Sequence, residues 1–437
     1  MITNKSFKIN DLGHLEIGGI DCVDLVKEFG SPLYVLDEQS IRDVCRKYTS
    51  ALKEYPDSLI CYASKALSTK AIYKIVQSEN LGADVVSGGE LFTAAAAGFD
   101  MSKVYFHGNN KTYDELVMAV KMGVHCIVID NYNDIDLLNR ISQENNNTKI
   151  KCLLRVNPGV EAHTHHYVQT SLPDSKFGFL IADGSALEAV KAIINTPNLE
   201  FLGIHCHIGS QIFDDKPFIA AMDKMTDFAA QVYDQLKTPV KELNMGGGYG
   251  IHYTSEDNPL PFENYIIGCI QALKEMLKIK NIPAPRLIFE PGRSIVGEAG
   301  VTLYTVGSIK EIKGLKKYVA IDGGMFDNPR YALYQSKYSC ILANRANQNP
   351  EEIVTIAGKC CESGDIIIEN ANLPKAKTGD ILAVFSTGAY NYSMASNYNR
   401  NLVPPMVLIN QGKAQYIVKP QTYEDLISRD EIPEWLK

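Results

Sequence analysis

The chain has 437 residues, which is enough for a large buried core and for more than one domain. Its hydrophobic fraction of 45% and charged fraction of 22% are ordinary for a soluble globular protein. A formal net charge of -8 leaves no basic surface for a phosphate backbone, so nucleic acid is not expected as a partner.

The same inventory bears on the compartment. Residues 1–17 lack the apolar core of a signal peptide, and no apolar run is long enough to cross a bilayer. The ten cysteines are scattered without a repeating spacing, and two of them, Cys360 and Cys361, are adjacent. Because neither a zinc ribbon nor a disulfide framework has that distribution, we expect reduced thiols in a cytoplasmic protein with no membrane partner.

Strand-like and helix-like patterns alternate over most of the chain. Residues 1–38 hold short β-like runs, Leu15–Ile17 and Leu33–Leu36, around a helix-like stretch from Val23 to Phe29. Amphipathic stretches such as Tyr113–Met122 and Phe218–Leu236 then separate eight apolar strand candidates. These candidates are Leu59–Ala63, Gly82–Val86, Val104–His107, Cys126–Ile129, Ile150–Val156, Phe201–His207, Glu242–Met245 and Arg286–Phe289. Eight such units predict a (β/α)8 barrel over residues 39–298, with an open doubly wound sheet as the alternative.

The pattern changes after Ser294. Gly, Asp and Asn turns there separate β-rich runs, which predict an antiparallel domain over residues 299–437 that also takes in residues 1–38. The runs are Val301–Ile309, Tyr318–Ile321, Ile353–Ala357, Ile366–Ile368, Ile381–Phe385 and Met406–Ile409.

Polar residues gather where the proposed barrel strands end, which is the functional face of such a barrel. The groups are Lys65, Asp84, His107–Asn109, Arg155–Gly159, His205–Gln211, Gly246–Gly248 and Glu290–Arg293. Lys65 lies between a strand and its helix, where a partly desolvated lysine can lose its proton and form a Schiff base. A single lysine in such a loop is more often a solvated surface residue, so the shared location of the groups is the signal.

Two of these groups suit a phosphorylated aromatic cofactor. The run Gly246–Gly248 lets backbone N–H groups approach a phosphate closely, although a tight turn would also explain it. Glu290 could keep a pyridine nitrogen protonated, and Arg293 could bind a phosphate or carboxylate. A local ion pair at the strand end is the other interpretation of that carboxylate and guanidinium.

Two histidines two residues apart, His205 and His207, share one face of their strand. One could be a core residue, and His207, nearer the strand end, could stack on an aromatic cofactor. The neighbouring sequence offers no third ligand, so no metal site is expected.

The β-rich region contributes a second set of candidates. Arg330 and Tyr334 lie four residues apart, Cys361 and Glu362 sit at a turn, and Tyr390 begins a run rich in polar and aromatic residues. Taken singly, these would be a solvated charge, a small buried thiol and a core aromatic.

The ordered set of motifs resembles diaminopimelate decarboxylase, a family of pyridoxal-phosphate (PLP) enzymes with an alanine-racemase-like barrel. The motifs spread from Tyr62 to Asn399 and read YASKA, GADVVSGGEL, HCHIGSQ, GGGYG, EPGRS, CESGD and GAYNYSMASNYN. The resemblance implies that Lys65 is the Schiff-base lysine and Cys361 the proton donor. It also implies a homodimer in which Cys361 and Glu362 reach into the partner subunit's barrel.

The resemblance further implies which residues surround the cofactor and the substrate. Glu290 would face the pyridine nitrogen, and Arg293 would lie near the phosphate and the substrate. The implied PLP contacts are Lys65, Asp84, His207, Ser210, Gly246, Gly247, Gly248, Glu290, Pro291, Gly292, Arg293 and Tyr390. The implied substrate contacts are Arg293, Arg330, Tyr334, Glu362 and Tyr390.

Two departures from the family pattern concern the β-rich region. The segment AGKCCESGD lacks a glycine-proline pair common in the family, and its doublet leaves Cys360 as an alternative to Cys361. Tyr331 stands where proline is common, which should alter local backbone freedom more than chemistry.

Substrate choice follows from charge at the far end of the substrate. A diamino-diacid carries both an ammonium and a carboxylate there, and Glu362 with Arg330 offers the matching pair. We therefore expect decarboxylation of meso-2,6-diaminopimelate to L-lysine and CO2, the last step of lysine biosynthesis. The alternatives are another basic amino-acid decarboxylase or an amino-acid racemase on this fold. A non-catalytic PLP-binding protein would lack the lysine or the β domain.

Overall fold

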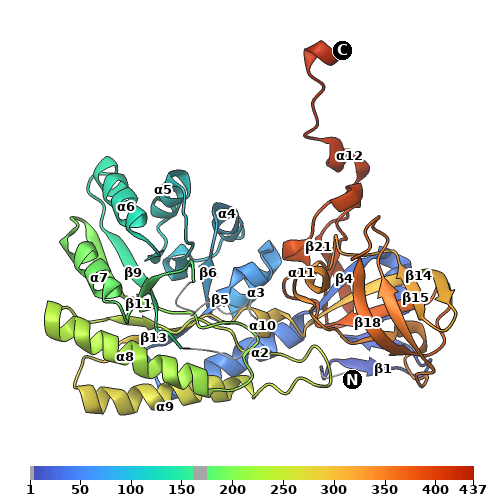
Figure 1. The fold of residues 1–437 in the computed structure, drawn as a ribbon, viewed down its shortest axis with the longest axis horizontal. Coiled ribbons are helices and arrows are strands. Elements are labelled where there is room, and N and C mark those ends of the chain that lie inside the picture. Colours follow the sequence, from blue (N-terminus) through green and yellow to red (C-terminus); the bar gives the residue numbers. More distant parts are fainter. Residues whose placement is uncertain (1–3, 161–174) are drawn as a thin grey trace. The chain divides into compact units, whose positions relative to one another are not determined.

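The structure is a computed structural model that describes residues 4–160 and 175–437. Its chain forms two compact units (Figure 1). The barrel unit comprises Arg42–Ile251 and Asn258–Ile295. The β unit comprises Met1–Ile41, His252–Asp257 and Val296–Lys437.

Eight parallel strands close the barrel unit into a ring. Each strand pairs with the next along the chain, and the last pairs with the first, with Ile288 opposite Leu59. In order around the ring they are β5 (Ser58–Ala63), β6 (Gly82–Val85), β7 (Val104–Phe106), β8 (Cys126–Ile129), β9 (Ile150–Asn157), β11 (Leu199–His205), β12 (Glu242–Asn244) and β13 (Arg286–Phe289). A short strand, β10 (Phe179–Leu180), adds to β9. The predicted closed barrel is confirmed, and the open sheet is wrong.

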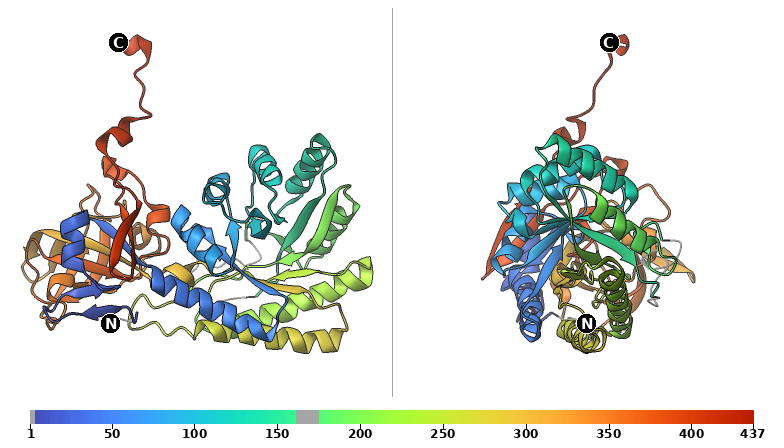
Figure 2. Two further views of the ribbon diagram at one scale, coloured as in Figure 1. Left: turned by 180° about the vertical axis from the view of Figure 1, so that it is seen from behind. Right: turned by 90° about the vertical axis from the view of Figure 1, so that its left-hand side faces the viewer.

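Helices surround these strands, as the right-hand view of Figure 2 shows. They are α2 (Glu38–Ala51), α3 (Lys70–Ser78), α4 (Gly88–Ala96), α5 (Tyr113–Met122), α6 (Tyr132–Glu144), α7 (Ser185–Asn195), α8 (Lys216–Leu236), α9 (Phe262–Lys280) and α10 (Arg293–Val296). Side-chain caps explain where α3 to α6 begin: Thr69, Ser87, Thr112 and Asn131 each accept a hydrogen bond from an N–H in the first turn. Short loops ending in such caps point successive helices back along the outside of the barrel.

Apolar side chains fill the interior of the barrel. The buried cluster is Leu59, Cys61, Tyr105, Cys126, Val128, Leu153, Leu202 and Ile288. A Cβ added at Gly203 would lie 1.9 Å from the Glu242 carbonyl oxygen, so only glycine allows β11 to approach β12 this closely. The filled interior leaves the strand ends as the place for a ligand.

The β unit is built on a mostly antiparallel sheet. Its strand order is β18-β17-β15-β14-β4-β20-β21, with β19 pairing both β14 and β16, and a separate small sheet holds β1, β2 and β3. Two of its pairs, β15–β17 and β4–β20, are parallel. The strands are β1 (Phe7–Ile9), β2 (Leu15–Ile17), β3 (Ile20–Asp21), β4 (Leu33–Asp37), β14 (Gly300–Ile312), β15 (Lys316–Ile321), β16 (Cys340–Leu342), β17 (Glu352–Ala357), β18 (Ile366–Leu373), β19 (Ile381–Phe385), β20 (Met406–Asn410) and β21 (Lys413–Val418).

The N-terminal segment is part of this β unit. Strand β4 lies between β14 and β20, and helix α1 (Cys22–Phe29) precedes it. Leu33 and Val35 of β4 lie in the same buried cluster as Val301, Leu303 and Val407. This confirms that the C-terminal β domain takes in the N-terminal segment.

One predicted strand is displaced by two residues. The sixth barrel strand was expected over Phe201–His207, but β11 spans Leu199–His205. The Cys206 N–H still bonds to the Asn244 carbonyl, and the chain then turns at Gly209, whose φ is 151°. As a result His207 follows the ladder instead of lying within it.

Two further findings concern the whole described chain. No helix in residues 4–160 and 175–437 combines the length and apolar character needed to cross a bilayer. All ten cysteines are free thiols, and seven of them are buried. Cys361 is exposed and Cys360 is partly exposed.

Candidate active site

A cavity of about 300 Å³ opens at the carboxyl ends of the barrel strands. Its walls carry charged and imidazole side chains from six of the eight strands or the residues after them. The lining residues are Lys65, Asp84, Val86, His107, Gly108, Asn109, Arg155, Phe177, His205, His207 and Glu290. The structure thus brings together strand-end residues that are far apart in the sequence.

Lys65 lies in a single 3-10 turn, Ser64–Ala66, between β5 and α3. The buried Ser64 hydroxyl contacts both the Asp84 carbonyl oxygen and a Glu90 carboxylate oxygen at 2.8 Å. The same Glu90 oxygen accepts a hydrogen bond from the Val86 N–H at 2.8 Å. These contacts hold the turn rigidly, so that the half-buried amine of Lys65 faces the cavity.

The segment after β13 is held against the end of β5. The Ala63 N–H donates to the Pro291 carbonyl at 3.1 Å. A Cβ on Gly292 would lie 2.8 Å from the Ala63 carbonyl oxygen. This close approach requires glycine, and it places the residues after Glu290 beside the strand that leads to Lys65.

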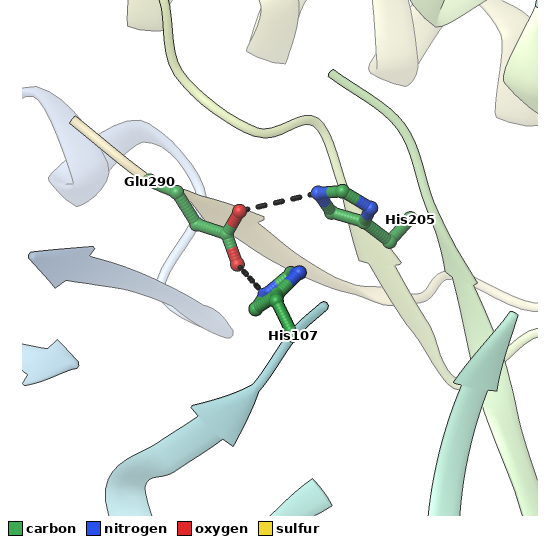
Figure 3. A group of neighbouring side chains, drawn as sticks. All are labelled: His107, His205 and Glu290. Carbon is green, nitrogen blue, oxygen red and sulfur yellow. Dashed lines mark hydrogen bonds and ion pairs between the residues drawn. The ribbon is translucent and has the colours of Figure 1, made fainter. Parts of the chain in front are cut away.

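Glu290 is the centre of a buried polar group (Figure 3). Its Oε1 accepts hydrogen bonds from His107 Nε2 at 2.8 Å and from Asn244 Nδ2 at 2.7 Å. Its Oε2 lies 3.2 Å from His205 Nε2. Burial alone would raise the pKa of Glu290, but the positive charge of His107 and the hydrogen bonds of both histidines bring it well below its ordinary value. Glu290 is therefore a carboxylate.

His107 lies between two carboxylates. Its Nε2 is 3.7 Å from Asp84 Oδ1, in addition to its bond with Glu290. Burial lowers its pKa, but Asp84 and Glu290 outweigh burial and leave the pKa raised, which favours the imidazolium form of His107. Burial raises the pKa of Asp84 to about 6, a rise that His107 opposes and Glu290 adds to.

The other two histidines of the cavity are neutral. Burial lowers the pKa of His205 to about 3, and its Nδ1 has no hydrogen-bond partner in the described chain. Burial, followed by the positive charges of Lys65 and Arg155, brings the pKa of His207 well below its ordinary value. His107, His205 and Glu290 have the residue types of metal ligands and lie close together in the fold, although they are far apart in the sequence. Each imidazole, however, bonds directly to the carboxylate.

Close backbone packing explains the glycine run Gly246–Gly248 after β12, whether or not a phosphate binds there. A Cβ on Gly247 would lie 2.1 Å from the Glu290 carbonyl oxygen, and one on Gly248 2.2 Å from the Gly209 carbonyl oxygen. The Gly246 and Gly247 N–H groups donate to Asn244 Oδ1 and His207 Nδ1. The Gly248 N–H makes no hydrogen bond within the described residues, which leaves it available to an anion.

A cationic group lies on the same unit. Arg293 Nη2 donates to the Ser210 hydroxyl at 2.9 Å, and Arg293 is buried. The Ser210 hydroxyl and the guanidinium can both donate hydrogen bonds to a phosphate oxygen. Ser210 follows β11, and Arg293 begins α10.

The remaining predicted residues lie in the β unit. Arg330 is buried, and its Nη1 donates to the hydroxyls of Tyr253 and Tyr338 at 2.8 and 3.1 Å. Its guanidinium carbon also lies 6.0 Å from the Tyr390 ring centre. Burial would lower the Arg330 pKa, but the tyrosines raise it, so the group stays charged. The expectation for an isolated arginine, a solvated charge, is wrong here.

Tyr334, Cys361 and Glu362 are more accessible than Arg330. Tyr334 ends the short helix α11 (Arg330–Tyr334) and is partly exposed. Cys361 and Glu362 lie in an exposed turn, and the Cys361 N–H donates to Asn399 Oδ1 at 2.8 Å. Burial and the neighbouring Asp365 raise the pKa of Cys360 to about 12, and its thiol contacts Asn401. The Cys361 thiol is the more accessible member of the doublet.

Several residues of the sites were given no individual role from the sequence, although His107 and Arg155 were named among the strand-end groups. They are Glu90, His107, Arg155, Asn244, Tyr253 and Tyr338. His107, Arg155 and Asn244 share the signal that was available, since each lies within or directly after a barrel strand near its carboxyl end. Tyr253 and Tyr338 carry no such signal, because they meet Arg330 only in the folded β unit.

The barrel matches a known protein family. Residues 41–297 match the model described as "Pyridoxal-dependent decarboxylase, pyridoxal binding domain". The barrel, its strand-end lysine and this match define the class of pyridoxal-dependent decarboxylases, so the cofactor is pyridoxal 5'-phosphate.

Full-length relatives narrow the class. The chain is 47% identical over 431 residues to the diaminopimelate decarboxylase of Bacillus subtilis, and the match covers 98% of both chains. It is 46% identical to that of Staphylococcus aureus, covering 97% of this chain and 99% of the other. A crystal structure of the M. jannaschii diaminopimelate decarboxylase in complex with L-lysine has a TM-score of 0.92, 36% identity and full coverage of both chains. The chain belongs to the diaminopimelate decarboxylase family, and the resemblance drawn from its motifs is confirmed.

The residues of the cavity fit the chemistry of this cofactor. They offer a primary amine at Lys65, an ionised carboxylate at Glu290 and a flat neutral ring at His207. Asp84 Oδ1 and His205 Nδ1 are buried polar atoms without a hydrogen bond in the described chain, as expected where a polar ligand completes a site.

The low pKa of His205 predicts acid sensitivity of the barrel. The unfolded chain binds a proton at this position below about pH 6.5, whereas the native state does not until about pH 3. Stability contributed by neutral His205 should therefore be present above about pH 6.5 and lost as the pH falls toward 3. In His205→Gln, which keeps a donor for Glu290, Tm should fall less between pH 6.5 and 4.5 than in the wild type.

This comparison uses slopes, because the substitution also changes packing at every pH. Thermal unfolding followed by circular dichroism at several pH values gives both slopes. Equal slopes in the two proteins would show that His205 does not titrate between the folded and unfolded states.

Proposed function

We propose that the chain catalyses PLP-dependent decarboxylation of meso-2,6-diaminopimelate to L-lysine and CO2, the last step of lysine biosynthesis. The observation that carries the proposal is the cavity of Lys65, Glu290 and His207 in a chain 47% identical to a diaminopimelate decarboxylase over nearly its whole length. The lysine in the M. jannaschii structure is the product that this reaction would form.

In the proposed site, the barrel unit holds the cofactor. The Lys65 amine would bind it covalently, Glu290 would face the pyridine nitrogen, and His207 would lie along the ring. Phosphate would be held by Ser210, Arg293 and the run Gly246–Gly248, mainly through the open Gly248 N–H. The other proposed contacts are Asp84, Pro291, Gly292 and Tyr390. When bound, the cofactor supplies a protonated ring that accepts the electron pair released as CO2 leaves.

The β unit would recognise the substrate. Arg330 is a buried guanidinium that forms no ion pair with a carboxylate of the described chain, and its tyrosine partners leave the charge uncompensated. We assign it to the distal carboxylate of the substrate, because an unpaired buried charge is costly. Glu362 would pair with the distal ammonium, and Arg293, Tyr334 and Tyr390 would complete the substrate contacts.

The proposed domain boundaries are 39–298 for the barrel, and 1–38 with 299–437 for the β domain.

A substrate panel tests this function. With added PLP, the wild type should release CO2 from meso-2,6-diaminopimelate and much more slowly from lysine, ornithine or arginine, which lack the distal carboxylate. Lys65→Ala should lose both the protein-bound yellow colour and turnover. Activity only on a simple basic amino acid, or racemisation without CO2 release, would contradict the proposal.

The Arg330 assignment can be read from the same panel. Arg330→Gln should raise KM for diaminopimelate and reduce the preference over lysine by about 10-fold or more, because one charged hydrogen-bonded contact contributes about 1.5–3 kcal/mol. A preference unchanged from the wild type would remove Arg330 from the substrate site.

Cys361 is proposed as the acid that protonates the carbon from which CO2 has left. Its thiol would give its proton to that carbon and become a thiolate, which solvent later reprotonates. Cys361→Ala should keep bound PLP and lower kcat by about 10²- to 10⁴-fold, the usual contribution of a positioned acid. The adjacent Cys360→Ala is the matched control and should stay near wild-type kcat. The reverse pattern in steady-state kinetics would make Cys360 the acid.

We further propose that the protein is a cytoplasmic homodimer with active sites at the subunit interface. Support comes from Cys361 and Glu362, which lie in an exposed turn. Their proposed roles require a bound substrate, which a partner subunit's barrel would bring to them. The C-terminal segment adds support, because its large apolar side chains are exposed. They are Tyr423, Ile427, Ile432, Trp435 and Leu436. Asp430 of this segment accepts a hydrogen bond from Arg400. Arg400 directly follows Asn399, whose side chain accepts the hydrogen bond from the Cys361 N–H.

Trp435 makes the dimer measurable. It is the only tryptophan of the chain and is 84% exposed within one chain. Sedimentation should give about twice the chain mass of 48.4 kDa, and dilution to the monomer should red-shift the tryptophan emission and increase its quenching by acrylamide. A single-chain mass at all concentrations would contradict the dimer.

A further inference from the structure

We propose that His107 is a positioning residue for the reaction, which holds Glu290 in place and in its charged form so that the carboxylate can keep the cofactor ring protonated. This inference rests on the proposed function. His107 need not touch substrate or cofactor to act in this way, since it acts through Glu290.

Geometry supports a dedicated contact. The His107–Glu290 bond of 2.8 Å joins the end of β7 to the end of β13, across the barrel mouth (Figure 3). Both side chains are about 95% buried. Asn244 binds the same oxygen, and His205 faces the other one, so the carboxylate is fixed from three strands. The His107 and His205 rings meet edge to face with centres 4.6 Å apart, which limits rotation of either ring.

Charge makes His107 different from the other two partners. The groups that face it are the carboxylates of Asp84 and Glu290, the neutral ring of His205 and the guanidinium of Arg155. Lys65 lines the same cavity. Asn244 is uncharged, and His205 is neutral, so His107 is the only cation that hydrogen-bonds to Glu290 within the described chain.

Removal of that cation would leave the buried side chains of Glu290 and Asp84 without the charge that lies between them. Burial would then act on Glu290 with less opposition and favour its protonated form. A neutral carboxylic acid cannot hold a second proton on the pyridine nitrogen, so the ring would lose its proton and much of its capacity to accept electrons.

The ring nitrogen can be observed directly. Apoprotein reconstituted with PLP labelled with 15N in the ring should give a protonated-nitrogen chemical shift in the wild type. In His107→Leu the shift should move to that of an unprotonated pyridine. In His107→Gln, which keeps a donor but not the charge, it should lie between the two. kcat should fall by about 10- to 100-fold, as when a partner that orients a functional group is lost, while KM for the substrate changes little.

A matched control exists in the same barrel. His125 and Glu242 form a pair with the same 2.8 Å separation, at the amino-terminal ends of β8 and β12. His125→Leu removes a comparable pair and should leave the 15N shift and kcat near those of the wild type. A protonated nitrogen in both His107 variants would overturn the inference, as would equal effects of His107→Leu and His125→Leu.

Failure of the proposed function looks different. A wild-type protein that binds no PLP, or binds it without releasing CO2 from any substrate, would contradict the function itself. If His107→Leu does not fold, the His107→Gln variant decides: a fully protonated nitrogen there shows that the charge of His107 is not required.

Discussion

The site depends on the hydrogen bonds and charge that stabilise one carboxylate, Glu290, buried in the mouth of the barrel. Glu290 is costly to bury as an ion, and only its partners make the charged form favourable. Those partners come from β7, β11 and β12, whereas Glu290 follows β13. Their strand ends converge because the eight strands close into a ring. Closure of the barrel is thus both the basis of the fold and the condition for a charged group at its centre.

The β unit also buries a charged side chain, but this charge is positive. Arg330 is a buried cation, and its contacts are tyrosine hydroxyls and rings instead of carboxylates. Tyr253 belongs to the β unit although it lies five residues after Gly248 of the barrel unit. The chain passes between the units four times, so neither unit is one continuous stretch. The roles proposed for the units, cofactor binding and substrate recognition, correspond to the opposite charges that they bury, Glu290 in one and Arg330 in the other.

Much of the fold could be predicted because its signals are local. Apolar runs located all eight barrel strands to within about two residues, and β8 and β13 were correct at both ends. Short strands were harder. β1, β3, β16 and β21 were not predicted because two to six residues at a sheet edge carry too little alternation to stand out. The β11 boundary was displaced because His207 extends an apolar pattern that the turn at Gly209 interrupts.

The sequence by itself determined the fold class, the family and the residues that belong to ordered motifs, such as Lys65 and Glu290, since these signals lie within a few neighbouring positions. The tertiary structure decided the states of those residues. His107 lies 183 positions from Glu290 and Asn244 lies 46 positions away, so no local pattern could join them. Burial and charge depend on which groups meet after folding. For that reason the ionised Glu290, the neutral His205 and the charged, enclosed Arg330 could be read only from the folded chain.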